Sequence, residues 1–80
     1  MSRYYFDLIT AEGMTDDDHG QEMASREVLR KEAIQLLPDI ARDELPGGDE
    51  ECFTVRVRDT DGRYVFEACL ILRARWLDLE

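Results

Sequence analysis

Two segments near the C-terminus that alternate between apolar and polar residues constrain the fold of this 80-residue chain most strongly. Residues 52–58 and 64–72 alternate with a period of two, which is typical of β-strands with one buried face. The residues between them include the turn-forming dipeptide Asp61-Gly62. We therefore predict that the two segments pair as an antiparallel hairpin.

The loop between these strands admits two pairing registers. A three-residue loop with a glycine bulge sets Val55 opposite Glu67, an apolar residue against a charged one. A two-residue turn at Asp61-Gly62 instead sets Val55 opposite Ala68 and Arg56 opposite Glu67. Because a slip of one residue exchanges the two faces of a strand, the apolar pattern predicts the two-residue turn.

The predicted register also places the two cysteines of the chain. Cys52 faces Ile71 and Cys69 faces Thr54, which makes the two thiols diagonal neighbours about 7–8 Å apart. A disulfide requires Cβ atoms about 3.8 Å apart. We therefore expect both cysteines to be free thiols.

The first half of the chain predicts one strand, two strand fragments and a helix. Residues 3–9 alternate as a strand, and shorter candidates follow at Met14-Thr15 and at residues 21–23. Ser25 is a suitable N-cap for a helix that extends to about Leu45. One stripe at helical spacing is formed by Leu29, Ala33, Leu36, Leu37, Ile40 and Glu44, and Val28 and Ala41 widen it.

Pro38 interrupts the hydrogen bonding of this helix. Proline lacks the N–H that would bond the Ile34 carbonyl, and inside a helix it costs about 3 kcal/mol. The apolar stripe continues past it through Ile40 and Ala41, which favours one kinked helix over two separate helices. The run Pro46-Gly47-Gly48 then ends the helix.

Together these elements predict an α+β fold. We expect a small antiparallel sheet of three or four strands, in the order β-(β)-α-β-β, with one long helix kinked near Pro38 on one face. Residues 1–80 form a single domain, since the chain is too short for two. Residues 73–80 form a C-terminal tail, whose final Leu79-Glu80 resembles an expression-tag scar. We expect Trp76 in this tail to fold back onto the core.

The chain is acidic, with 19 acidic against 10 basic residues and a formal net charge of -9. This charge opposes direct binding to nucleic acid or to an anionic membrane, whose phosphates require cations. No apolar run approaches the roughly 20 residues that span a bilayer, and the N-terminus has no export signal. We therefore expect a cytoplasmic protein with reduced cysteines.

One acidic run has the side-chain chemistry of a cation site. An EF-hand calcium loop needs a glycine at its sixth position, whereas Gly20 is the fifth residue counted from Asp16. Because the match is poor, we expect a solvated loop and no cofactor. The weak metal candidates in this run are Asp16, Asp17, Asp18 and His19.

The sequence contains no arrangement typical of a catalytic centre. His19 is the only histidine, and it lies in the acidic run rather than near Cys52 or Cys69. The serines and threonines have no evident base or oxyanion-stabilising partner in the sequence. We therefore expect that the protein is not an enzyme.

The order of several short motifs resembles a known family. The motifs are the opening residues 3–7, the Asp-rich loop ending in Gly20, Glu22-Met23 before the capped helix, Arg30 and Glu32-Ala33 within it, and the hairpin residues 57–63. This arrangement is similar to short alphaproteobacterial proteins classed together as a domain of unknown function. The resemblance implies a stand-alone domain of about this size, and it supplies no functional residues. Pro38 and the Arg-Ala-Arg-Trp tail depart from it.

The last strand is apolar on both sides, which suggests a function. Alternation turns Tyr64 and Phe66 towards the helix and Val65, Cys69 and Ile71 towards the other face. An exposed apolar patch usually marks a partner surface. We therefore expect a protein-interaction or regulatory module, able to form a homodimer and bind a protein partner. Its expected partner surface is Tyr5, Ile9, Val65, Cys69, Ile71 and Trp76.

Two other functions remain as alternatives. The negative charge would suit an acidic decoy that occupies a basic nucleic-acid-binding protein. The acidic run would suit a weak metal-binding or small-ligand-binding protein.

Overall fold

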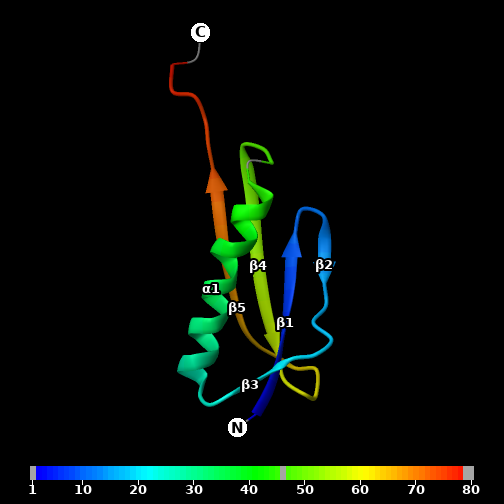
Figure 1. The fold of residues 1–80 in the computed structure, drawn as a ribbon. Helices are drawn as coiled ribbons and strands as arrows, with labels where there is room; N and C mark the ends of the chain where they lie inside the picture. The colour runs from blue at the N-terminus through cyan, green and yellow to red at the C-terminus, as the bar shows by residue number, and fades with distance from the viewer. Residues whose placement is uncertain (1, 46, 79–80) are drawn as a thin grey trace.

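The computed structural model describes residues 2–45 and 47–78, and one helix packs on one face of an antiparallel sheet (Figure 1). The sheet has the strand order β2-β1-β4-β5, and β3 also pairs with β1. The predicted α+β fold class is therefore confirmed. In chain order the elements are β1 (Ser2–Thr10), β2 (Gly13–Thr15), β3 (Gln21–Met23), α1 (Arg26–Glu44), β4 (Glu50–Arg58) and β5 (Tyr64–Arg73).

The sheet has five strands rather than the predicted three or four. The difference comes from the two short strands, which pair with opposite ends of β1. β2 pairs with residues 8–10 and β3 with residues 2–4. Each has only three residues, too few to show an alternating pattern in the sequence, and each is held by the nine-residue β1 beside it.

The ends of α1 are set by capping groups. The Ser25 hydroxyl oxygen accepts a hydrogen bond from the Val28 N–H at 3.2 Å, as predicted for an N-cap. At the other end the Leu45 N–H donates to the Ala41 carbonyl at 2.9 Å. The predicted stop at Pro46-Gly47-Gly48 falls partly outside the described residues, because Pro46 is not among them.

α1 continues through Pro38 as one helix, so the prediction of one helix instead of two is confirmed. Pro38 is exposed, and water can therefore bond the Ile34 carbonyl that has lost its helical donor. The bend at this position stays a prediction. Within the described part of the chain, no helix is long and apolar enough to cross a membrane.

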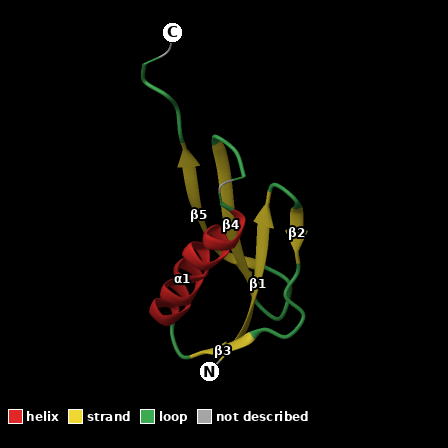
Figure 2. Cartoon of the chain, turned by 45° about the horizontal axis from the view of Figure 1, so that its top comes forward, coloured by secondary structure: helices red, strands yellow, loops and turns green. Residues whose placement is uncertain are grey.

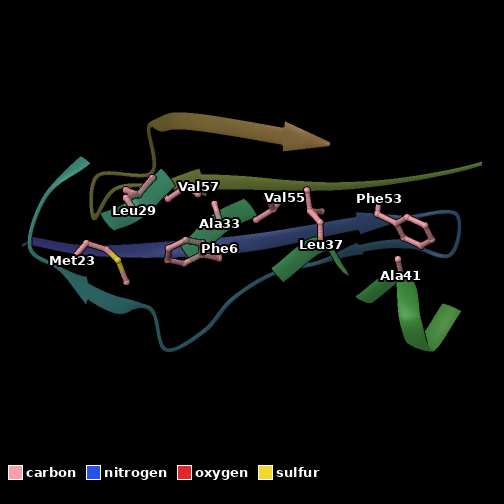
Figure 3. Close-up of a cluster of buried hydrophobic side chains, with 9 residues drawn as sticks. All are labelled: Phe6, Met23, Leu29, Ala33, Leu37, Ala41, Phe53, Val55 and Val57. Carbon is pink, nitrogen blue, oxygen red and sulfur yellow. The ribbon is translucent and has the colours of Figure 1, made fainter. Parts of the chain in front are cut away.

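Apolar side chains between α1 and the sheet form the core (Figure 3). They come from one stripe of α1 and from the helix-facing side of β1, β3 and β4. β4 lies between β1 and β5 in the sheet, and its core residues are at most 1% exposed. The core consists of Phe6, Met23, Leu29, Ala33, Leu37, Ala41, Phe53, Val55 and Val57.

The pairing of β4 with β5 follows the predicted register over most of its length. Apolar residues pair on the helix side, and the other side carries the charged pair Arg56–Glu67 together with the cysteines and Ile71. Both cysteines have the predicted neighbours, and both are free and exposed. The pairs predicted and present are Val57–Phe66, Val55–Ala68, Arg56–Glu67, Thr54–Cys69 and Cys52–Ile71.

The predicted two-residue turn, however, is wrong. The Asp59 N–H donates to the Arg63 carbonyl at 2.9 Å and the Gly62 N–H donates to the Asp59 carbonyl at 3.0 Å, which closes a three-residue loop. A two-residue turn of Asp-Gly type needs positive φ at both central residues. Gly62 has a φ of 86°, but Asp61 is not in this region. The Asp59 carboxylate also accepts the N–H groups of Asp61 and Arg63, at 2.9 and 3.0 Å.

A β-bulge at Val65 connects this loop with the apolar pairing beyond it. Arg58 pairs with Tyr64 whereas Val57 pairs with Phe66, so Val65 is the extra residue. The bulge exchanges two side chains relative to the prediction. Tyr64 lies on the face away from α1, and Val65 packs against the core beside α1. The prediction that Val65 lies on the face away from the helix is therefore wrong.

Residues 74–78 continue beyond β5 as a tail, and Figure 2 shows it pointing away from the body of the molecule. The Ala74 N–H donates to the Asp49 carbonyl at 2.8 Å, which prolongs the direction of β5. Trp76 is 80% exposed, so the predicted fold-back onto the core is wrong. Residues 74–77 contain no glycine, proline, asparagine, aspartate or serine that would favour a turn. The suggested tag scar at Leu79-Glu80 lies outside the described residues.

Candidate functional site

The face of the sheet opposite α1, called the back face below, holds a buried carboxylate. Asp7 lies in the middle of β1 and is 0% exposed. Arg58 donates to it from Nε at 2.9 Å and from Nη2 at 3.3 Å. The Tyr64 hydroxyl donates at 3.1 Å and the Asp17 N–H at 2.9 Å. Asp7 therefore joins β1, β4, β5 and the loop that precedes β3.

The loop of residues 16–20, called the acidic loop below, is held by the side chain of Asp17. One carboxylate oxygen accepts the Phe6 N–H of β1 at 3.0 Å, where neither β2 nor β3 pairs with that strand. The other oxygen accepts the N–H groups of His19 and Gly20, at 3.1 and 3.2 Å. The Asp17 carbonyl accepts Nη2 of Arg58 at 2.9 Å. The acidic loop is therefore fixed to the sheet by these hydrogen bonds.

Both aspartates remain ionised more readily than an ordinary carboxyl. Burial raises the pKa of Asp7, but hydrogen bonds from Arg58, the Asp17 N–H and Tyr64, together with the Arg58 charge, outweigh it and lower the pKa. Burial likewise opposes ionisation of Asp17, and the N–H groups of Phe6, Gly20 and His19 lower its pKa below the ordinary value. The hydrogen bond to Asp7, burial and the Asp7 charge raise the pKa of Tyr64.

Arg58 closes this network towards solvent. Its side chain is 26% exposed, and its guanidinium carbon lies 4.7 Å from the centre of the Tyr5 ring. Beside it, on the more exposed part of the back face, Arg56 Nε lies 2.6 Å from Glu67 Oε1 in an ion pair. These are the two residues that were predicted to face each other. The network is therefore buried at Asp7 and covered by aromatic and cationic groups.

This arrangement is suited to holding elements together rather than to catalysis. Asp7 has a donor on each oxygen, and no buried side-chain nitrogen or oxygen in residues 2–45 and 47–78 lacks a hydrogen-bond partner. The groups that bind Asp7 come from distant parts of the chain, up to 57 residues away. We interpret the network as a clamp that joins the acidic loop and the β4–β5 hairpin to β1.

The four weak metal candidates do not converge. Asp17 turns inward and binds backbone N–H groups, whereas Asp16, Asp18 and His19 are exposed. Among the described residues, no group of three or more His, Cys, Asp or Glu side chains could hold a metal ion. The oxygen atoms of Asp17 are directed at the backbone of the loop and of β1, because these amides have no strand partner there.

The predicted partner surface is divided by the structure. Ile9 pairs with Thr54, which pairs with Cys69, so Ile9 and Cys69 lie in one row on the back face. Ile71 lies further along β5 on the same face and is 52% exposed. Tyr5 also lies there, but beyond the Asp7 row. Of the remaining two residues, Val65 packs beside α1 and Trp76 lies in the tail.

β5 is an edge strand of the sheet. Within the described part of the chain it pairs only with β4. It is ten residues long, and large apolar side chains remain exposed on both of its faces. Leu70, on the helix side opposite Phe53, is 40% exposed, and its neighbour Ile71 is 52% exposed on the back face. The edge of β5 is therefore long and partly apolar.

A comparison with known families agrees with the resemblance seen in the motifs. Residues 3–71 match the family described as a domain of unknown function, DUF6894. The chain belongs to this family. No curated protein and no solved structure matches it. The matched residues of this DUF6894 domain include the whole clamp and most of β5, and they stop before the tail.

Sequence reasoning did not find the clamp of this DUF6894 domain. Alternation along residues 3–9 puts Asp7 on the face opposite Phe6, but its burial depends on the acidic loop and on Arg58, which no local pattern connects to it. One signal was present: an aspartate in the middle of a strand between Phe6 and Leu8, both apolar. Tyr64 was missed because the bulge that turns it to the back face was not foreseen.

Proposed function

We propose that this protein is a self-associating protein-interaction module whose binding element is the edge of β5. The observation that carries the proposal is a ten-residue edge strand with exposed apolar residues on both faces. Edge strands in monomeric proteins are usually short or protected by charges, proline or bulges, because their free N–H and C=O groups accept another strand.

The protection of β5 is confined to one end. The bulge at Val65 interrupts the first residues of the strand. From Phe66 to Arg73 the pairing with β4 is regular, and the only charged residues are Glu67 and Arg73. This regular segment supports strand addition, in which backbone hydrogen bonds supply affinity and neighbouring side chains supply specificity.

The other surfaces support this function less well. The clamp is saturated by its own hydrogen bonds, and the acidic loop is occupied with backbone contacts. A net charge of -9 disfavours nucleic acid and anionic membranes as partners. The two exposed free thiols suit a reducing compartment, so we propose a cytoplasmic location. We also propose that the protein has no enzymatic activity.

The test is the molecular mass in solution over a concentration series, measured by sedimentation velocity. The wild-type protein is expected to reach twice its monomer mass, and Leu70→Lys is expected to remain monomeric because it puts a charge on the edge strand. Met14→Lys is the matched control, since Met14 is 48% exposed but lies on β2 at the other side of the sheet. A wild-type protein that stays monomeric at millimolar concentration would contradict the proposal.

A further inference from the structure

The regular segment of β5 restricts how two copies of the chain could pair, and the inference drawn from it rests on the proposed self-association. An antiparallel pairing of two β5 strands puts both helices on the same side only if helix-facing residues oppose helix-facing residues. The regular segment from Phe66 to Arg73 then allows two central registers, one with Leu70 on the axis and one with Cys69 on the axis.

Charge distinguishes the two registers. With Leu70 on the axis, Glu67 of each copy lies opposite Arg73 of the other, and Cys69 lies opposite Ile71. With Cys69 on the axis, Glu67 lies opposite the apolar Ile71. Arg56 contacts Oε1 of Glu67, while Oε2 has no partner among the described residues, and Arg73 makes no ion pair with them. Arg73 has Glu50 opposite it on β4, so the register centred on Leu70 adds two further pairs of opposite charge across the interface, whereas the other register adds none between Glu67 and its partner.

The same register gives the tail a place to bind. In this register Phe66 of one copy lies opposite Ala74 of the other. Residues 75–77 of the second copy would therefore lie beside the start of β5 of the first. Trp76 is two residues beyond Ala74 and thus on the helix side. At that end of β5 a narrow pocket lies between α1 and the sheet, bordered by Phe66 and by Val65 at the bulge. The described residues that line it are Tyr4, Arg26, Leu29, Val65 and Phe66.

We propose that the indole of Trp76 from a second copy packs over the mouth of this pocket, whose volume is about 50 Å³, in a dimer paired through β5 with Leu70 on the two-fold axis. The flat face of an indole suits a surface of aliphatic and aromatic side chains that includes an arginine. Residues 73–77 carry two arginines and no acidic residue in a chain of net charge -9, so the tail is attracted to another copy. In the single copy the Trp76 side chain is 80% exposed, which is what this proposal expects of a tail without its binding partner.

Tryptophan fluorescence reports directly on this site, because Trp76 is the only tryptophan. We expect the emission of the wild-type protein to shift to shorter wavelength as concentration rises, in step with the mass measured by sedimentation. Trp76→Ala is expected to raise the dimer dissociation constant at least about tenfold. Leu77→Ala is the matched control, since Leu77 is 84% exposed but falls on the other side of an extended tail.

Disulfide trapping tests the register. In Cys52→Ala/Ile71→Cys, residue 71 lies opposite Cys69 of the second copy, at the Cα separation of about 4.5–5.5 Å that a disulfide accepts. Removing Cys52 prevents a bond within the chain, because Cys52 pairs with Ile71. We expect a covalent dimer after mild oxidation of this variant. Cys52→Ala alone is expected to stay uncrosslinked, since Cys69 then has only a diagonal cysteine neighbour.

The outcomes separate this inference from the proposed function. A wild-type protein that does not associate overturns both. Association without a shift in Trp76 emission overturns the binding site while the proposed function stands. A covalent dimer of Cys52→Ala alone establishes the register centred on Cys69 and overturns the one proposed.

Discussion

Arg58 donates to both carboxylate oxygens of Asp7, at 2.9 Å from Nε and 3.3 Å from Nη2, across 51 positions of sequence. The two residues meet because β1 and β4 are neighbours in the sheet, with Tyr5 opposite Arg58. Charge-assisted hydrogen bonds of this kind are stronger than neutral ones. Loss of this carboxylate is therefore expected to weaken the attachment of the acidic loop and of the β4–β5 hairpin to β1.

Asp7→Asn is expected to destabilise the fold by about 2–3 kcal/mol, because a buried charge that accepts several hydrogen bonds is replaced by a neutral amide. The measurement is the free energy of unfolding from urea denaturation. Asp16→Asn is the control, since Asp16 is exposed, and it should change stability by less than about 0.5 kcal/mol. Equal effects of the two substitutions would contradict the role of Asp7.

Acid is expected to weaken the clamp. Asp7 and Asp17 have folded-state pKa values below the ordinary 3.8, so the unfolded chain binds protons first as the pH falls. Their contribution to stability is thus fully present above the ordinary carboxyl range and is lost as the pH falls through the lowered pKa values. Urea unfolding between pH 7 and pH 2 should show a shallower loss for Asp7→Asn/Asp17→Asn than for wild type. Parallel curves would count against this account.

Tyr64 is expected to ionise at higher pH than a free tyrosine, because its hydroxyl donates to the Asp7 carboxylate and that charge opposes a phenolate. Stability from this hydrogen bond is present below the ordinary tyrosine range and is lost as the pH rises through the raised pKa. The difference between the ultraviolet titration curves of the wild-type protein and of Tyr64→Phe isolates this residue from the other tyrosines. In an Asp7→Asn background the pKa of Tyr64 should fall back, and an unchanged value would refute the assignment.

Two glycines with positive φ are expected to differ in their tolerance of alanine. At Gly62, with φ 86°, a Cβ would meet no atom within 4 Å, so the expected cost is about 1–2 kcal/mol from the backbone conformation alone. At Gly20, with φ 71°, a Cβ would lie 2.9 Å from the Tyr4 carbonyl oxygen and 2.8 Å from the Tyr5 ring. Thermal unfolding should therefore show the larger loss for Gly20→Ala, and the reverse order would contradict the geometry.

Local pattern was sufficient for the elements and for much of their pairing. The Ser25 cap, the continuous helix through Pro38 and the pairing of Arg56 with Glu67 all follow from spacing within short segments. Alternation assigns a face to each strand residue, and a hairpin connects strands that are close in sequence. That is why Arg56 and Glu67 were matched correctly, 11 residues apart.

The clamp could not be predicted in the same way. The register between β1 and β4 joins segments separated by the helix, and alternation alone does not specify it. Whether a back-face aspartate is buried depends on what covers that face, and here the cover comes from the acidic loop and from Arg58 and Tyr64. These contacts exist only when the chain is folded.

The β4–β5 hairpin shows both what the sequence determines and what only the tertiary structure decides. Its sequence by itself determined that residues 52–58 and 64–72 pair with apolar residues on the helix side, because a one-residue slip would expose that face. Only the tertiary structure decided the loop, since Asp61 does not adopt the positive φ that a two-residue turn needs. The three-residue loop then required a bulge at Val65, which turned Tyr64 to Asp7 and left the edge of β5 regular from Phe66 onward.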